Sequence, residues 1–196
     1  MSVTDFLLPL FGYLAGAVPF GLVICYMAGL GDIRKIGSGN IGATNVLRTG
    51  NKLAAFATLI GDAGKGGALV WLCVALGYEA QAPLVGLMAV IGHCYPVWLG
   101  FKGGKGVATA IATIAVLYWP AGLAMALTWL VMSAIFRISS LSALTGFVAA
   151  GVVSALYYEA WVIVVMIAAL SFWRHRENIA RLLNGTESKI SFSKSS

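Results

Sequence analysis

The residues best suited to chemistry are gathered in three short polar stretches of an otherwise apolar sequence. The first stretch, GSGNIGATNVLR (37–48), combines glycines with hydroxyls, amides and one arginine. Glycine turns let successive backbone N–H groups point inward, an arrangement that binds anions. Hydroxyl and amide groups add neutral donors, and an arginine fork suits phosphate. The stretch therefore predicts an anion site, with these candidate ligands: Ser38, Asn40, Gly42, Ala43, Thr44, Asn45 and Arg48.

The second stretch, HCYPVWLGFKGGKGVAT (93–109), places glycines on both sides of Lys105 and precedes an apolar helix, whose N-terminus also favours an anion. It is not a Walker A motif, because Gly106 and Val107 follow Lys105 where the magnesium-binding serine or threonine is required, and nucleotide hydrolysis is therefore disfavoured. His93 lies one turn before Pro96, where a helix bends, and we predict that it packs or orients its neighbours. Two anion sites predict two phosphorylated ligands, or one ligand with two phosphates. The candidate ligands in this stretch are Lys102, Gly103, Gly104 and Lys105.

The third stretch, RHRENIARLLNGTE (174–187), brings Arg174, His175 and Asn178 to one helix face if the last helix continues through it. An alternative for this stretch is a basic helix end among anionic lipid headgroups. A Gly/Ser/Asn loop alone is commonly a turn, and a lysine-rich inner loop commonly follows the positive-inside rule. The occurrence of all three stretches on one side of the membrane favours the ligand-binding interpretation.

Asp62 and Lys65 are spaced i, i+3 within an apolar segment. Charges at that depth are costly and face a partner or a water-filled cavity, so both side chains are expected to point inward. They form either an ion pair that holds the bundle or a polar floor beneath the first stretch. The three cysteines have neither zinc-site nor disulfide spacing, and no metal site is predicted.

The elements that must position these residues are membrane helices. The chain has 196 residues, of which 60% are hydrophobic and 10% are charged, against about 25% charged in soluble domains. The net charge of +6 is explained by the placement of basic residues in loops rather than by binding of nucleic acid. The first apolar segment exceeds the ~7–15 residues of a cleavable signal core and predicts a retained helix. Apolar segments occur at about 6–30, 53–77, 82–101, 107–136, 141–158 and 160–173.

The segment at 107–136 is either one tilted helix or a hairpin broken at Tyr118-Trp119-Pro120. With a hairpin, all basic residues except Lys65 lie on one side, including Lys194 in the tail, while Asp5, Glu79 and Glu159 lie on the other. The positive-inside rule makes the basic side cytoplasmic. We therefore expect an all-α membrane protein with seven transmembrane helices, a periplasmic N-terminus and a cytoplasmic C-terminus. Residues 1–196 form one domain, with cytoplasmic loops at about 32–52, 93–109 and 174–187.

These three stretches, together with GDAGKG (61–66), resemble the signatures of the bacterial acyl-phosphate:glycerol-3-phosphate acyltransferases, the PlsY family. The resemblance implies a multi-pass inner-membrane enzyme with its active site facing the cytoplasm and no cofactor. Its substrates would be acyl phosphate and glycerol 3-phosphate. The acyl chain would move to the sn-1 hydroxyl, giving lysophosphatidic acid and phosphate, the first step of phospholipid synthesis. A partner enzyme would make acyl phosphate from acyl carrier protein. The sequence departs from the family at Pro19, where relatives often carry a Gly-Ser-Ile-like run.

The resemblance also implies roles for individual residues. The first stretch would hold one phosphate and the reacting carbonyl, and Gly103, Gly104 and Lys105 would hold the other phosphate. His175 and Asn178 would contact glycerol 3-phosphate, while Arg137 and Lys102 would add positive potential. The catalytic candidates are Ser38, Arg48, Lys105 and His175, supported by Asp62, Lys65 and His93.

The same comparison bears on the mechanism, because neither histidine has an acid five residues later: Trp98 and Ala180 stand there. The His-x-x-x-x-Asp signature of acyl-CoA-using enzymes is missing, so we predict catalysis by proximity and electrostatic stabilisation. The donor's own phosphate, rather than His175, is the favoured proton acceptor. Two alternatives are a transporter of organic phosphates and a scaffold that binds anionic lipid. Transporters place their site near the midplane between repeated halves, which this sequence does not suggest.

Overall fold

The computed structural model describes residues 2–157 and 161–190, so Lys194 and Glu159 lie outside the described residues. Within that part of the chain all regular structure is helical, with no β-strand, as the sequence predicted. The helices are α1 (Thr4–Gly16), α2 (Phe20–Met27), η1 (Ile33–Lys35), α3 (Ala43–Leu47), α4 (Lys52–Ala75), α5 (Ala82–Cys94), η2 (Val97–Leu99), α6 (Val107–Leu117), α7 (Trp119–Phe136), α8 (Ser139–Tyr157), α9 (Trp161–Arg174) and α10 (Arg176–Leu183).

Five helical segments of the described chain are long and apolar enough to cross a membrane: Thr4–Met27, Lys52–Ala75, Ala82–Leu99, Trp119–Phe136 and Ser139–Tyr157. Two shorter apolar helices, α6 and α9, accompany them. Many large apolar side chains on the long helices are exposed at the surface of the protein, among them Phe6, Trp71 and Leu130. Such an apolar outer surface is typical of helices that face lipid rather than water.

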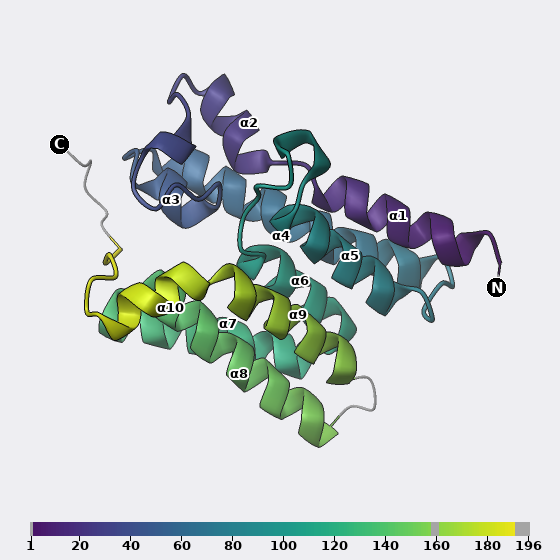
Figure 1. Ribbon diagram of the computed structural model, residues 1–196. Helices are drawn as coiled ribbons and strands as arrows, with labels where there is room; N and C mark the ends of the chain where they lie inside the picture. The colour runs from purple at the N-terminus through teal and green to yellow at the C-terminus, as the bar shows by residue number, and fades with distance from the viewer. Residues whose placement is uncertain (1, 158–160, 191–196) are drawn as a thin grey trace.

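The helices form one bundle in which α1, α4 and α5 lie together and α6 to α9 make the other half (Figure 1). The largest core cluster joins α5 to α9 and contains the fully buried side chains of Ile114, Met125, Phe147 and Ile167. The N-terminus lies at one end of the bundle, and α3 and α10 lie at the opposite end. The polar stretches are therefore gathered at one end, as the positive-inside argument required.

The apolar segment at 107–136 is a hairpin, which confirms the break expected at Tyr118. The backbone of Tyr118 leaves the helical conformation, with φ −146° and ψ 76°, and it separates α6 from α7. Pro120 lies in the first turn of α7, where its missing N–H would have no partner in any case. With 11 residues, α6 is about 16 Å long, well short of the ~30 Å hydrocarbon core.

The first apolar segment is not a single helix, contrary to the expectation for 6–30. Helix α1 ends at Gly16 and α2 begins at Phe20, because Pro19 lacks an N–H and its ring clashes with the preceding turn. The Lys65 ammonium donates to the Val18 carbonyl oxygen at this break (2.8 Å).

The last helix is also interrupted. Helix α9 ends at Arg174, His175 has φ −94° and ψ 4°, and α10 begins at Arg176. The common helix face expected for Arg174, His175 and Asn178 therefore does not form. Arg174 instead turns to the backbone of the second loop, whereas His175 and Asn178 line a cavity.

Candidate active site

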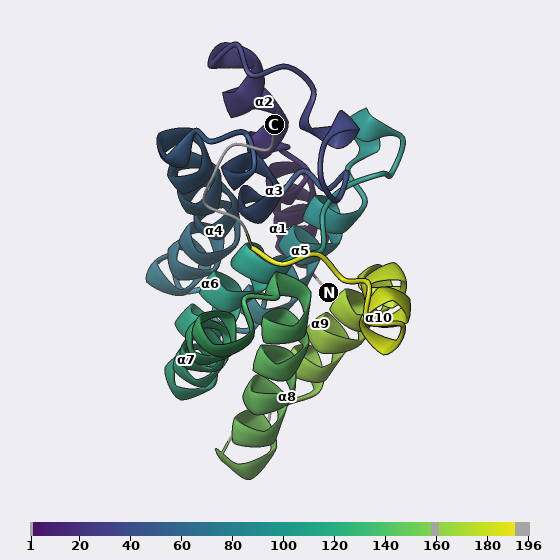
Figure 2. The same cartoon turned by 90° about the vertical axis from the view of Figure 1, so that its left-hand side faces the viewer.

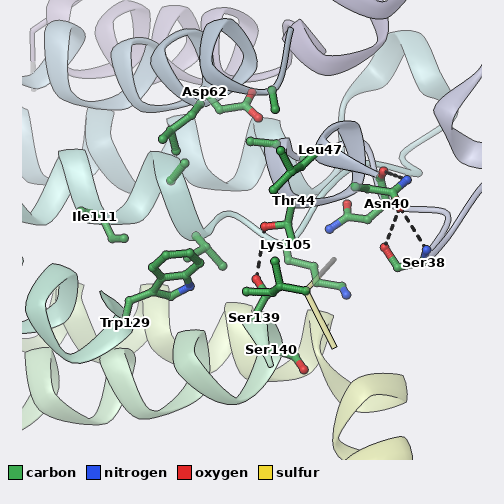
Figure 3. Close-up of a pocket in the computed structure, with 18 of the residues that line it drawn as sticks. Ser38, Asn40, Thr44, Leu47, Asp62, Lys105, Ile111, Trp129, Ser139 and Ser140 are labelled. Atoms are coloured by element: carbon green, nitrogen blue, oxygen red, sulfur yellow. Dashed lines mark hydrogen bonds between the residues drawn. The ribbon is translucent and has the colours of Figure 1, made fainter. Parts of the chain in front are cut away.

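A cavity of about 640 Å³ opens where the three polar stretches meet. Ser38 and Asn40 lie at one end of it and Trp129 and Ile111 at the other, with Lys105 between them (Figure 3). The polar lining comes from Ser38, Asn40, Gly42, Thr44, Asn45, Arg48, Lys52, Lys105, Ser139, Ser140, His175, Asn178, Glu187 and Ser188. The cavity therefore joins a cation-bearing polar end to an apolar end.

The first loop is folded around the side chain of Asn45, which is 2% exposed. Its amide nitrogen donates to the carbonyl oxygens of Ile33 and Asn40 (both 2.8 Å), and its Oδ1 accepts from the Ser38 N–H (3.1 Å). Asn45 thus shapes the loop that presents Ser38 and Arg48, in addition to lining the cavity. Gly37 permits this fold, because its φ is +53° and a Cβ atom there would lie 2.6 Å from Arg48 Cδ.

Two side-chain contacts tie this loop to distant parts of the chain. Thr44 Oγ1 lies 3.2 Å from Ser139 Oγ at the start of α8, and the Arg48 guanidinium donates to Ser188 Oγ (2.7 Å). Ser188 belongs to the segment 184–190, which follows α10 and runs back across this end of the bundle (Figure 2). The polar end of the cavity is therefore bounded by α3, α8 and this C-terminal segment.

The glycines of the second loop differ from the prediction. The Gly103 N–H donates to the Cys94 carbonyl (3.1 Å) and the Gly104 N–H to the His93 carbonyl (3.0 Å), so neither amide is directed at an anion. The Arg174 guanidinium donates to the carbonyls of Gly103 (2.8 Å) and Gly104 (3.0 Å). These bonds fix the backbone of the loop, and what the loop offers to the cavity is the side chain of Lys105.

The Lys105 ammonium donates to Asn178 Oδ1. Burial lowers the pKa of Lys105 to about 8, although the nearby Glu187 carboxylate works against this shift. Asn178 is held in turn, because its amide nitrogen donates to Glu187 Oε1 (2.6 Å). Glu187 also accepts from Ser140 (2.8 Å) and Arg181 (2.7 Å). Burial opposes ionisation of Glu187, but these three hydrogen bonds hold its pKa below the ordinary value.

His175 is 2% exposed and lines the cavity. Its Nδ1 lies 2.7 Å from the Ser171 carbonyl oxygen, which can only accept, so Nδ1 carries the hydrogen and Nε2 carries the lone pair. Burial lowers the pKa of His175 to about 4, against the effect of the bond to Ser171. The imidazole is therefore neutral at pH 7 and can accept a hydrogen bond through Nε2.

Lys102 and Arg137, both predicted to add positive potential, lie elsewhere. Lys102 is exposed and is not among the described residues that line the cavity. The Arg137 guanidinium donates to the Ile190 carbonyl (3.1 Å), and the Arg137 carbonyl accepts from the Ile190 N–H (2.6 Å). Arg137 thus anchors the C-terminal segment rather than facing the cavity.

Asp62 and Lys65 form a buried ion pair (2.9 Å), and Asp62 Oδ1 lies 3.5 Å from His93 Nδ1. Asp62 and Lys65 both lie on α4, so the ion pair itself joins no helices, but Lys65 reaches the Val18 carbonyl between α1 and α2. Asp62 and His93 also line the cavity and form a polar part of its wall. Among the residues that the structure describes, no group of three acidic, histidine or cysteine side chains is placed to hold a metal ion.

Part of the polar lining and the individual residues of the apolar end were not identified from the sequence. Glu187 closes the third stretch, so its place in that motif was a usable signal, whereas Ser188 and the Ser139-Ser140 pair gave none. The apolar end is walled by three helices, and the exposed fractions of Phe56 (60%), Ile60 (56%) and Leu130 (57%) show that it opens at the outer surface. Its lining residues are Ala55, Phe56, Leu59, Ile60 and Ala63 on α4, Val107, Ala108 and Ile111 on α6, and Ala126, Trp129 and Leu130 on α7.

Comparison with known proteins places this chain in a family. Residues 6–185 match the family described as glycerol-3-phosphate acyltransferase. A glycerol-3-phosphate acyltransferase of Paramagnetospirillum magneticum is 58% identical over 185 residues, covering 91% of this chain and 90% of the relative. The fold matches crystal structures of PlsY (YgiH), an integral membrane glycerol 3-phosphate acyltransferase, with 36% identity and 96% of each chain covered. The TM-score is 0.89 for its glycerol 3-phosphate form and 0.87 for its lysophosphatidic acid form. This chain belongs to the glycerol-3-phosphate acyltransferase family.

Proposed function

We propose that this protein transfers an acyl chain from acyl phosphate to the sn-1 hydroxyl of glycerol 3-phosphate, releasing lysophosphatidic acid and inorganic phosphate. The observation that carries the proposal is the two-part cavity. Its polar end holds Arg48, Lys52 and Lys105, and its apolar end opens through the walls of α4 and α7. A ligand that fits has an anionic head and a hydrocarbon chain, which describes both the donor and the product.

The polar end can hold two phosphates. Arg48 offers a planar fork and Lys105 a point charge, and both groups are restrained by neighbours that a phosphate can displace or join. Ser38 and Thr44 add hydroxyl donors, and His175 Nε2 and Asn178 remain for the glycerol hydroxyls. The charge of two phosphates would be balanced largely by these cations, which lie in a partly enclosed site where electrostatic stabilisation is strong.

In the reaction, the sn-1 oxygen forms an ester bond with the acyl carbon, and the bond from that carbon to the phosphate oxygen breaks. The hydroxyl proton goes to the departing phosphate. His175 is a poor alternative acceptor, because a pKa of about 4 makes it a much weaker base than a phosphate dianion, whose pKa is about 6. We assign His175 the role of accepting a hydrogen bond that orients the hydroxyl. Lys105 and Arg48 stabilise the negative charge that develops on the carbonyl oxygen and the leaving phosphate.

The same proposal covers topology and location. Adding the two short apolar helices to the five long segments gives seven crossings of a bacterial inner membrane, with the N-terminus periplasmic and the cavity at the cytoplasmic face. Residues 1–196 act as one domain whose motif loops are those at about 32–52, 93–109 and 174–187. Lipids surround the bundle, and a separate enzyme supplies acyl phosphate from acyl carrier protein.

The test is an assay of the purified protein with glycerol 3-phosphate and palmitoyl phosphate, following release of phosphate and formation of lysophosphatidic acid. Palmitoyl-CoA serves as the competing donor in a parallel reaction. Turnover with acyl phosphate alone supports the proposal. Equal use of palmitoyl-CoA would overturn the assignment of acyl phosphate as the donor. If folded protein turned over neither donor, the proposed reaction would be wrong and transport of organic phosphates would become the favoured function.

A further inference from the structure

His93 lies beneath the loop that carries Lys105, in a place that the proposed mechanism leaves without a role. It belongs to the last turn of α5 and is 4% exposed. Its carbonyl oxygen accepts from the Gly104 N–H, and a Cβ atom at Gly104 would overlap His93 Nε2 and its neighbouring ring carbons. The loop therefore rests directly on the imidazole ring, at the residue next to Lys105.

The ring is held from the other side by α4. Asp62 Oδ1 lies 3.5 Å from His93 Nδ1 and 2.9 Å from the Lys65 ammonium. Thr109 Oγ1 donates to the Asp62 carbonyl oxygen (2.8 Å), which joins α4 to the beginning of α6. His93 thus lies between the Asp62 carboxylate on α4 and the backbone of Gly104.

A second set of contacts holds the loop from the side of α9. The Arg174 guanidinium donates to the Gly103 and Gly104 carbonyls, and it lies over the Tyr95 ring, 5.0 Å from the centroid. With Arg174 on one side and the imidazole on the other, the path of the backbone into Lys105 is determined. The Lys105 ammonium then reaches Asn178 Oδ1, its one hydrogen-bond partner among the residues that the structure describes.

We infer that His93 is a positioning residue for acyl transfer, whose ring, held by Asp62, sets the place of the Lys105 ammonium through contact with Gly104. The expected effect on the rate of acyl transfer rests on the proposed function, whereas the expected effect on the position of Lys105 does not. The size of the ring, and not its charge, makes the contact. A change in that size must therefore be felt at Lys105, and a matched change at Gly104 must compensate for it.

The experiment is a double-mutant cycle on the purified full-length protein, with Gly104→Ala, His93→Ala and the double variant. Gly104→Ala is expected to lower kcat/KM by about 100-fold, because a displacement near 1 Å of a catalytic group has that effect. The double variant should recover about tenfold of this loss, since the added methyl group then occupies space vacated by the ring. Selectivity between palmitoyl phosphate and a shorter acyl phosphate should stay constant, because the apolar walls are untouched.

Two matched controls separate positioning from general damage. Gly64→Ala adds a methyl group to α4 where no heavy atom lies within 4 Å, and Thr113→Val changes a buried polar side chain outside the cavity lining. Both should keep wild-type kinetics and melting temperature. His93→Gln, which keeps much of the ring's length, should retain more activity than His93→Ala, and it serves in place of His93→Ala if that variant does not fold.

A readout independent of turnover is the pH dependence of Lys105 labelling by an amine reagent, followed by mass spectrometry. Loss of the ring should admit water to Lys105 and raise the pKa at which it is labelled above the wild-type value of about 8. If wild-type protein transfers no acyl chain, the proposed function fails and the labelling still decides the role of His93. Independent, multiplicative effects in the cycle, or unchanged Lys105 labelling in a folded His93 variant, would overturn the inference.

Discussion

The ammonium group of Lys105 should produce the alkaline limb of the pH profile of this enzyme. Burial lowers the pKa of Lys105 to about 8, and the cationic form is the one that stabilises a phosphate or an oxyanion. Raising the pH through 8 therefore removes the required charge. Lys105 is about nine tenths protonated at pH 7 and about one tenth protonated at pH 9, so kcat/KM should fall about tenfold between these two pH values.

The change that tests this assignment is Lys105→Arg. A guanidinium remains charged throughout this range, so the variant should lose the alkaline limb even if its larger group lowers the plateau. Lys102→Arg is the matched control, because Lys102 is exposed in the same loop and does not line the cavity. That variant should retain both the limb and the plateau.

The assay is kcat/KM for glycerol 3-phosphate with palmitoyl phosphate from pH 6 to pH 9.5, since this ratio reports the groups of the free enzyme and free substrate. Melting temperatures across the same range show whether the protein stays folded. A limb of unchanged midpoint in the Lys105→Arg variant would refute the reasoning. So would a wild-type profile that stays flat up to pH 9.5.

Three further changes probe other parts of the cavity. Glu187→Gln should lower kcat by about tenfold, because the loss of a charged acceptor frees the Asn178 amide to turn; a wild-type kcat in steady-state assays would contradict this. Arg48→Lys should lower kcat/KM about 10- to 100-fold through loss of the planar fork, measured with both substrates varied, and equal activity would remove Arg48 from the phosphate site. Ala126→Trp should fill the apolar end and raise the KM for palmitoyl phosphate more than that for a short acyl phosphate, whereas Leu123→Trp, on the exposed face of α7, should not.

The large-scale organisation was predictable because it depends on charge placement, which can be counted along the chain. The hairpin at Tyr118 follows from the requirement that Arg137 and the tail lie on the same side as Lys105. The break before α2 was missed because the prediction relied on charge placement. A kink at Pro19 does not move any basic residue to the other side of the membrane. A charge count detects crossings and is blind to bends within one crossing.

The residue types that the loops use could be predicted from the sequence, but the directions in which their backbone N–H groups point could not. Glycines let a backbone place its N–H groups on a ligand or on its own carbonyls, and the sequence GGKG is compatible with both. The helix end at Cys94 leaves carbonyl oxygens of its last turn free, and the Gly103 and Gly104 amides bond to two of them. Lys105, the residue between these glycines, lines the cavity, and its role as a phosphate ligand stays a prediction.

Contacts between residues that are distant in the sequence could not be predicted from short motifs. Ser188 is 140 residues from Arg48, and Glu187 is 47 residues from Ser140. The family resemblance implied that Arg137 adds positive potential to the site, but this residue lies at a left-handed turn, with φ +57°, and its guanidinium bonds to Ile190. Which cations face a cavity is decided by the packing of helix ends, and a single sequence carries no record of that packing.

Under the proposed function, the short helix α6 explains why the reaction would take place at the boundary between water and lipid. It is about 16 Å long and lies between α4 and α7, which have 24 and 18 residues. Because α6 begins only at Val107, the loop before it brings Lys105 inside the bundle, while α4 and α7 continue past it as apolar walls. A hydrocarbon chain can therefore remain against Phe56 and Trp129 while its phosphate reaches Lys105. In the proposed reaction, this arrangement would let a water-soluble acceptor meet a lipid-bound donor inside the bundle.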